Sequence, residues 1–227
     1  MGNVPPNVRA TSSLTVTRIA RPRMTKTARV TVLFADLRGY TGLAERLAPA
    51  QIFPLLDEFF AVLAAATGLH GGQVFHVAGD GMMAGFGVGA SAAEEGARAA
   101  LAAGHTMLGD FAPLAERWRQ DHSIETGIGI GLHTGEVALG LMGPPGKRHT
   151  TLVGDTVNVA ARLCGRARAG EVLLSCTVAA ALDAKTTRGD ANARPIAFLH
   201  LPQFELRGRS APLDIWCVPA PERVAVS

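Results

Sequence analysis

The sequence predicts an α+β fold in which a mostly antiparallel central sheet is flanked by helices. Short segments with apolar residues at alternate positions indicate strands, and longer segments with apolar residues three or four apart indicate helices. The two kinds of segment do not alternate regularly, as they do in proteins with a parallel βαβ sheet. The chain has 227 residues, of which 48% are hydrophobic, and this is enough for one domain with its own core.

The limits of this domain are predicted from composition. Residues 1–27 contain five basic side chains and no apolar period, so we expect a flexible basic arm there and the folded domain over residues 28–220. The net charge of the whole chain is only +3, which leaves the domain nearly neutral and argues against a nucleic-acid-binding face. The cysteines lack metal-ligand spacing and are expected to be packed free thiols (Cys164, Cys176 and Cys217).

The sequence predicts neither a membrane span nor a signal peptide. It has no run of eighteen apolar residues, and no basic segment leads into an apolar one at the N-terminus. We therefore expect a cytoplasmic location and no membrane span.

Two segments each present one carboxylate at a turn. Residues 30–41 (VTVLFADLRGYT) are predicted to form a strand that presents Asp36 and ends in a bend at Gly39. Residues 71–87 are typical of a hairpin, whose turn sequence AGDG places Asp80 at the tip. Either aspartate alone is typical of a capping or turn residue. If the hairpin lies beside the strand, the two carboxylates converge and, with water and phosphate oxygens, suit Mg²⁺ or Mn²⁺.

The elements between and after these segments follow from periodicity and breakers. A short helical turn is expected at residues 43–47 and a longer helix from Pro49. An Ala-rich helix is predicted over residues 91–120, with a break expected near residues 109–113. The apolar face of the helix that starts at Pro49 is expected to contain Ile52, Phe53, Leu55, Leu56, Phe59, Phe60 and Leu63.

The second half of the chain is predicted to supply the rest of the sheet. Residues 125–134 and 136–141 are expected to be two strands joined by a tight turn at Gly135, with the many glycines marking close backbone packing. His133 in this run is interpreted as a packed histidine rather than a catalytic one. A further strand is expected at residues 150–153, then a helix after Gly154. Residues 171–218 should hold three or four short strands, a small helix at 177–182 and a flexible loop at 183–193.

Two polar residues share one face of the helix after Gly154. Asn158 and Arg162 are four residues apart and therefore lie on the same side of a helix. Two interpretations stay open. The pair is either part of an ordinary solvated surface, or an amide and a guanidinium that orient a ribose and neutralise charge on a phosphate.

In this order and at these separations, three motifs resemble the catalytic domain of class III nucleotidyl cyclases. They are LFADLRGYT at residues 33–41, AGDG at 78–81 and LVGDTVNVAARL at 152–163, and the resemblance covers about residues 28–218. It implies a ferredoxin-like fold related to the palm of polymerases. It also implies head-to-tail homodimers with active sites at the interface, where a nucleoside triphosphate is converted to the 3′,5′-cyclic monophosphate and pyrophosphate.

The resemblance also implies a role for each matching residue. Asp36 and Asp80 match the aspartates that bind two Mg²⁺ or Mn²⁺ ions. Asn158 and Arg162 match residues that, from the partner chain, position the ribose and stabilise the transition state. Arg207 falls where the family usually has a lysine that contacts the phosphates. The backbone segment that holds the triphosphate matches Leu37, Arg38, Gly39, Tyr40 and Thr41.

Three positions bear on the choice of substrate. His76 stands where a lysine recognises adenine or a glutamate recognises guanine, whereas Thr151 fills the second base-contacting position as in adenylate cyclases. Gly129 stands where many members have an arginine near the phosphates. ATP is the expected substrate. The alternatives are a cyclase for GTP or a pyrimidine triphosphate, a His76 that only packs beside the hairpin, and a degenerate nucleotide-binding module.

Overall fold

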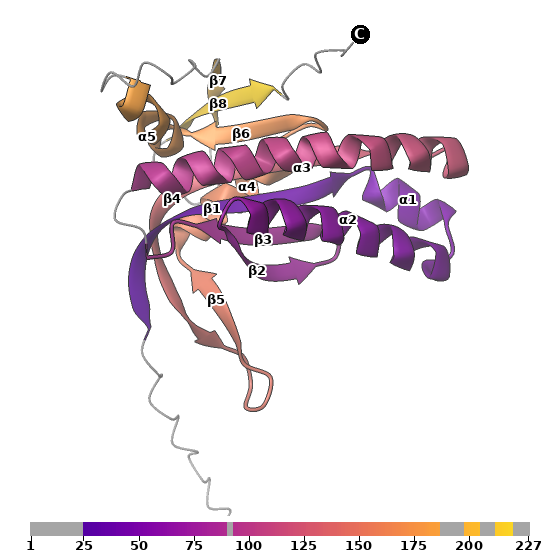
Figure 1. Ribbon diagram of the computed structural model, residues 1–227, viewed down its shortest axis with the longest axis horizontal. Helices are drawn as coiled ribbons and strands as arrows, with labels where there is room; N and C mark the ends of the chain where they lie inside the picture. The colour runs from indigo at the N-terminus through magenta and orange to yellow at the C-terminus, as the bar shows by residue number, and fades with distance from the viewer. Residues whose placement is uncertain (1–24, 90–92, 187–197, 205–211, 220–227) are drawn as a thin grey trace, which may run out of the picture.

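The structure is a computed structural model that describes residues 25–89, 93–186, 198–204 and 212–219 (Figure 1). Its helices are α1 (Tyr40–Arg46), α2 (Pro49–Leu69), α3 (Ala93–His122), α4 (Asp155–Arg166) and α5 (Cys176–Thr186). Its strands are β1 (Lys26–Arg38), β2 (Gln73–Ala78), β3 (Gly81–Phe86), β4 (Gly127–Met142), β5 (His149–Val153), β6 (Glu171–Ser175), β7 (Leu199–Phe204) and β8 (Leu213–Pro219).

The strands form one sheet in the order β2-β3-β1-β4-β6-β8-β7, with β5 paired to β4 outside this path. The β4–β6 pair is parallel and the pairs on either side of it are antiparallel. This mostly antiparallel sheet with flanking helices confirms the predicted α+β class. β1 begins at Lys26, two residues before the predicted start of the domain, and the predicted domain limits remain a prediction.

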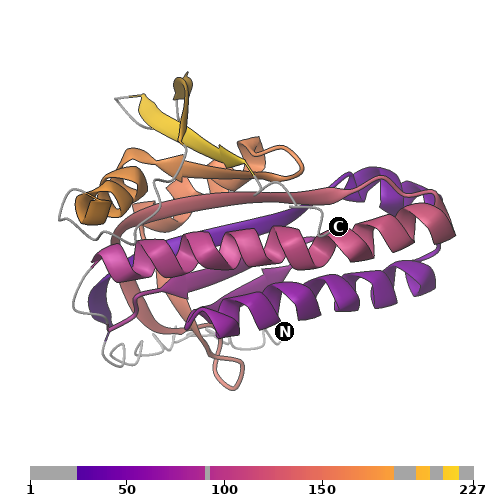
Figure 2. The same cartoon turned by 45° about the horizontal axis from the view of Figure 1, so that its top comes forward.

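Helices cover both faces of the sheet. α2 and α3 run side by side over one face (Figure 2), and their core includes Leu33 and Leu37 of β1. α4 lies over the other face, where its Ala160 packs with Val30 and Val32. Because side chains alternate along a strand, Asp36 lies on the same face as Val32, the face covered by α4.

β4 is one continuous strand of 16 residues, so the predicted turn at Gly135 is wrong. Gly135 pairs with Val30 of β1 inside the ladder. A side chain at this position would meet the Thr156 hydroxyl of α4 at 2.5 Å, and that hydroxyl donates a hydrogen bond of 2.7 Å to the carbonyl of Glu136. The glycine therefore allows α4 to approach the sheet, as the prediction of close backbone packing requires, and makes no turn.

The same close approach gives a stability prediction at Gly131. A methyl group there would collide with the backbone nitrogen of Cys164 and lie 2.5 Å from the carbonyl oxygen of Ala160, and backbone atoms cannot move aside cheaply. Gly131→Ala should lower the free energy of unfolding by about 3 kcal/mol, the upper end of the usual overpacking cost. Urea denaturation followed by circular dichroism measures the change.

Gly165 of α4 provides the matched control for this variant. A Cβ at this helical glycine would meet nothing within 4 Å. Gly165→Ala should therefore raise the free energy of unfolding by about 0.5–1 kcal/mol, since alanine is the better helix former. Equal effects of the two substitutions would contradict the packing of α4 against β4.

The helices differ from the prediction in three places. α3 runs without a break through Pro113. Pro113 cannot donate a helical hydrogen bond to the carbonyl of Gly109, but both residues are exposed, so water can bind that carbonyl. Phe111 and Leu114 of the same turn are buried in the core and hold the helix in place. Phe53 of α2 is 76% exposed and does not belong to the buried face. The predicted loop at residues 183–193 is in part helical, since α5 continues to Thr186, and its remainder lies outside the described residues.

Helix α2 is long and apolar enough to cross a membrane by length and composition. Core helices of soluble proteins pass the same test. α2 contributes Leu55, Phe59 and Leu63 to the core under the sheet, which accounts for its apolar composition. The test by length and composition does not distinguish a core helix from a membrane span, so the absence of a membrane span remains a prediction.

Candidate active site

The two predicted acidic residues meet at one end of the β3–β1 pair. Asp36 lies opposite Gly81, and the backbone nitrogen of Leu37 donates a hydrogen bond of 3.0 Å to the carbonyl of Asp80. Gly79 adopts a left-handed conformation (φ 60°) that forms the tight turn between β2 and β3. Burial raises the pKa of the Asp36 carboxyl, the charge of Asp80 raises it further, and the neighbouring Arg38 lowers it in part, with a raised pKa as the net result.

This pair of carboxylates fits a small divalent cation. Within the described parts of the chain, no group of three or more His, Cys, Asp or Glu side chains is arranged to hold a metal ion. Among the described His, Cys, Asp and Glu side chains, the carboxylates of Asp36 and Asp80 are the candidate ligands at this point, so a bound ion would need further oxygen atoms, such as those of water or phosphate, to complete its coordination. That donor set is typical of Mg²⁺ and Mn²⁺ and unlike a closed zinc site.

The Arg38 side chain makes a contact that the sequence analysis missed. Its Nη1 donates to the Asp36 carboxylate at 2.7 Å, and its Nη2 donates to the carbonyl of Cys164 at the end of α4. The guanidinium lies directly over Gly129, where a Cβ would collide with it. A cation thus lies at the position where Gly129 replaces an arginine. The period of two could have revealed the Asp36 contact, because residues 36 and 38 share one face of β1.

The segment predicted to hold the triphosphate follows directly after Asp36. β1 ends at Arg38, Gly39 adopts φ 82°, and α1 begins at Tyr40 and includes Thr41. The hydroxyl of Thr126 donates a 2.6 Å hydrogen bond to the carbonyl of Arg38 and so fixes the end of the strand. The bend predicted at Gly39 is therefore present, and it depends on a conformation that favours glycine.

Asn158 and Arg162 share one face of α4, as their spacing predicts, and this is the outer face of the helix. Both side chains are exposed. The inner face of the helix buries Thr156, Val159, Ala160, Leu163 and Cys164. The guanidinium bound to Asp36 contacts Cys164 on this inner face, so Arg162 points to the other side of the helix from the chain's own Asp36.

His76 contacts a histidine that the sequence analysis did not consider. Its ring stacks on that of His149, with centroids 6.2 Å apart and planes inclined by 27°. His149 begins β5, and Thr151 lies two residues further along the same strand. The structure therefore brings the two predicted base-contacting positions to strands β2 and β5, which contact each other although they are not paired in the sheet. The alternation of β5 could have indicated His149, because residues 149 and 151 share a face.

The other predicted positions are easily placed. His133 is buried, and its Nδ1 lies 2.7 Å from the hydroxyl of Ser175, so it is the packed histidine that was predicted. Cys164 and Cys217 are buried free thiols and Cys176 is a half-buried one. Arg207 lies outside the described residues.

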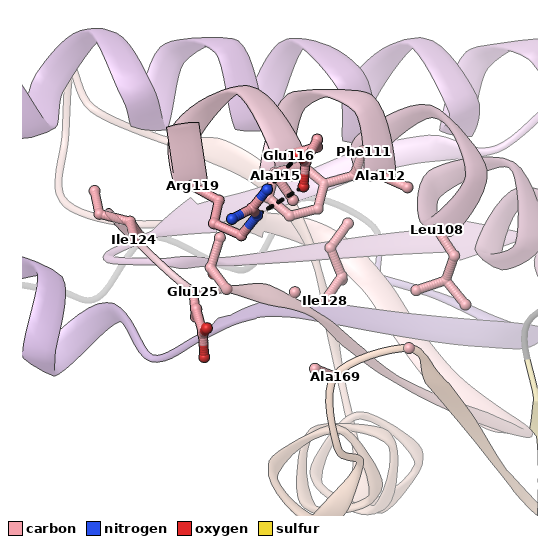
Figure 3. Close-up of a pocket in the computed structure, with 13 residues that line it drawn as sticks. Leu108, Phe111, Ala112, Ala115, Glu116, Arg119, Ile124, Glu125, Ile128 and Ala169 are labelled. Atoms are coloured by element: carbon pink, nitrogen blue, oxygen red, sulfur yellow. Dashed lines mark hydrogen bonds and ion pairs between the residues drawn. The ribbon is translucent and has the colours of Figure 1, made fainter. Parts of the chain in front are cut away.

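A cavity of about 410 Å³ lies between α3, the start of β4 and the turn after α4 (Figure 3). Its walls are mostly apolar, with Leu108, Phe111 and Ile128 among them. Its charged pair, Glu116 and Arg119, is joined by hydrogen bonds of 2.6 and 2.8 Å. None of the predicted site residues lines this cavity, so we do not assign it to the candidate site.

A pair of carboxylates at the end of a strand, beside a hairpin of an α+β sheet, is an arrangement that metal-dependent nucleotidyl-transfer proteins can use. The sequence model of the adenylate and guanylate cyclase catalytic domain matches residues 23–212. The chain belongs to this family. The predicted family and the predicted enzyme class, a phosphorus–oxygen lyase of the adenylate cyclase type, are thereby confirmed.

Known relatives agree with this assignment. An adenylate cyclase of Anabaena cylindrica is 33% identical over 147 residues, which cover 61% of this chain and 27% of the relative. The adenylyl cyclase CyaB from P. aeruginosa has a similar structure (TM-score 0.79, 27% identity, covering 88% of this chain and 98% of that one). The guanylyl cyclase Cya2 is also similar (TM-score 0.74, 26% identity, 89% and 98% covered). The chain spans about a quarter of the length of the curated relatives it matches.

Proposed function

We propose that this chain converts a nucleoside triphosphate, ATP in first place, to the 3′,5′-cyclic monophosphate and pyrophosphate at a site shared by two copies. The observation that carries the proposal is the meeting of Asp36 and Asp80 at the end of the β3–β1 pair, directly before the turn at Gly39. Two Mg²⁺ or Mn²⁺ ions held by these carboxylates would supply activation of the ribose 3′ oxygen and neutralisation of the leaving pyrophosphate.

The chain's own groups do the binding and orienting. The turn from Leu37 to Thr41 offers backbone groups beside the carboxylates for the triphosphate. The partner subunit's Asn158 orients the ribose, and the partner subunit's Arg162 meets the charge that develops on the phosphoryl oxygens. A guanidinium suits this task because it stays charged and presents a planar set of donors.

Two features support a shared site. Asn158 and Arg162 face outward from α4, on the opposite side of the helix from the chain's own Asp36. A site that contains all three side chains therefore needs Asn158 and Arg162 from a second copy. The arm formed by β4 and β5 projects from the sheet (Figure 1) and carries half-exposed apolar side chains, namely Leu141, Met142 and Val153. Apolar groups that gather on an exposed arm are typical of a protein interface.

ATP is proposed as the substrate because Thr151 keeps the position found in adenylate cyclases, and because an imidazole at position 76 can donate one hydrogen bond to the adenine base. The stacking of His76 on His149 holds this ring at the edge of β2 beside β5. A neutral imidazole is a weaker donor than a lysine, so discrimination between bases should be modest.

His76→Lys should sharpen this preference. A lysine adds a charged hydrogen bond to the N1 acceptor of adenine and lacks an acceptor of its own, so the ratio of kcat/KM for ATP to that for GTP should rise about tenfold. Steady-state assays with both nucleotides measure the ratio. The control is His122→Lys in the last turn of α3, which makes the same substitution far from β2 and β5 and should leave the ratio unchanged. An unchanged ratio in His76→Lys would show that residue 76 does not contact the base.

The proposed function is tested with purified protein, Mg²⁺ or Mn²⁺, and each of the four common nucleoside triphosphates. Mass spectrometry identifies the cyclic products, and cyclic AMP should be formed fastest. A preference for CTP or UTP would overturn the adenylate assignment. Nucleotide binding without turnover would instead identify a degenerate regulatory module. A cytoplasmic location is part of the proposal, supported by three cysteines that form no disulfide.

A further inference from the structure

The guanidinium of Arg38 binds Asp36, whose carboxylate is proposed to bind the metal ion. Its Nη1 lies 2.7 Å from Oδ2 of Asp36, while Oδ1 faces Gly81 on the hairpin side. The Arg38 and Asp36 side chains are 23% and 31% exposed, so water and a hydrated ion have access to the pair. One lone-pair direction of the proposed ligand is thus already used by a residue of the chain itself.

Of the three nitrogen atoms of the Arg38 guanidinium, two have hydrogen-bond partners and one has none. Nη2 binds the carbonyl of Cys164, but Nε is buried and has no hydrogen-bond partner. A buried N–H of a charged group without a partner raises the free energy of the arrangement. The carbonyl of Cys164 also accepts a hydrogen bond of 3.0 Å from the nitrogen of Ala167, so it keeps a partner when Arg38 leaves. Departure of the guanidinium therefore leaves no group newly unsatisfied at this end of α4.

Space for the guanidinium in this position comes from Gly129. The side chain passes over the bare backbone of β4 at this residue, where any Cβ would collide with Nε and Nη2. Arg38 lies on β1 beside it and reaches Asp36 on the same face of the same strand. The pairing of β1 with β4 thus leaves room for the guanidinium beside the Asp36 carboxylate.

Electrostatics makes this contact a competitor of the divalent ion. A guanidinium and a divalent cation at one carboxylate repel each other over a few ångströms, and the site is partly shielded from water. Without an ion, Arg38 offsets part of the repulsion between Asp36 and Asp80. With an ion bound, the same positive charge opposes the ion. The guanidinium and the ion therefore compete for the Asp36 carboxylate, and their repulsion is strongest when both are close to it.

We propose that Arg38 is an exchangeable counter-ion of the acidic site: it neutralises Asp36 while no divalent ion is bound, and it gives up this carboxylate when the ion binds. Arg38 then sets the concentration at which the ion binds in the absence of nucleotide. The proposal rests on the proposed function in one respect, because it takes Asp36 as a metal ligand.

The test measures Mn²⁺ binding to the nucleotide-free protein by electron paramagnetic resonance of the free ion. Arg38→Gln removes the charge and keeps hydrogen-bonding groups, and it should lower the Kd for Mn²⁺ about tenfold. Arg38→Lys retains a positive charge and should stay within about twofold of the wild-type Kd. The control is Arg46→Gln, which removes one exposed positive charge from the neighbouring helix α1 and should also change the Kd by less than about twofold.

A double variant shows whether the effect passes through Asp36. In Asp36→Asn, the further change Arg38→Gln should give no tightening, because the competed carboxylate is gone. An unchanged or higher Kd in Arg38→Gln alone, or a tightening that survives in Asp36→Asn, overturns the proposal. Loss of packing weakens metal binding, so a structural role of Arg38 cannot imitate the expected tightening.

Failure of the proposed function has a different signature. If the wild-type protein forms no cyclic product from any nucleotide, the proposed function fails regardless of the Mn²⁺ titration. If it forms the product and Arg38→Gln binds Mn²⁺ no more tightly than the wild type, only the counter-ion proposal fails.

Discussion

Asp36→Ala and Asp80→Ala should each lower the rate of cyclic nucleotide formation by at least about 10³-fold, while the domain stays folded. Each substitution removes one of the two carboxylates that the described chain offers to the ions, so the charge of the triphosphate is no longer neutralised at the reacting centre. Neither side chain is part of the apolar core. Initial rates at saturating nucleotide and Mn²⁺ measure the loss, and circular dichroism checks the fold.

The matched control for these variants is Asp57→Ala. Asp57 is an exposed aspartate on α2, on the face of the sheet away from α4, and its removal should leave the rate unchanged. The free energy of unfolding should change by less than about 1 kcal/mol in all three proteins, as is usual for substitutions outside the core. A normal rate in Asp36→Ala or Asp80→Ala would remove that residue from the mechanism.

Mixing inactive Asp36→Ala protein with inactive Arg162→Ala protein should restore activity. Arg162→Ala alone should lower kcat more than it raises KM, because its contact is made mainly in the transition state. In a mixed dimer one site carries both substitutions and the other carries none. At equal concentrations and complete exchange, half of the dimers are mixed and each has one intact site, so about a quarter of the wild-type activity is expected.

A second mixture separates a shared site from other effects of mixing. Asp36→Ala and Asp80→Ala alter the same half of the site, so each site of their mixed dimer still lacks one carboxylate. This mixture should stay inactive. If subunit exchange is shown by native mass spectrometry and the Asp36→Ala and Arg162→Ala mixture also stays inactive, each site is formed by one chain alone.

Much of the fold and of the candidate site follows from local sequence. The alternating apolar residues of β1 place Asp36 on one face and near the end of the strand, and the AGDG turn makes a hairpin with Asp80 at its tip. The four-residue spacing puts Asn158 and Arg162 on one face of α4. Signals of this kind involve neighbours along the chain, so they do not depend on the rest of the fold.

Other features were decided by contacts between distant segments. Glycine favours turns, but at Gly135 α4 packs against the sheet and the strand continues. Pro113 should interrupt a helix, but the core around Phe111 and Leu114 keeps α3 intact. In both places packing outweighs a local preference worth about 1–3 kcal/mol, because burial of a whole helix face contributes more.

The sequence by itself determined which residues can carry the chemistry, namely the two aspartates, the Asn158 and Arg162 pair, and the bend at Gly39. Only the tertiary structure decided what those residues touch. The guanidinium of Arg38 reaches Asp36 because Gly129 of another strand leaves room for it, and His76 stacks on His149 because β5 lies beside β2. Such contacts join residues up to 126 positions apart in the chain, and no local pattern encodes them because their energy exists only once the sheet has formed.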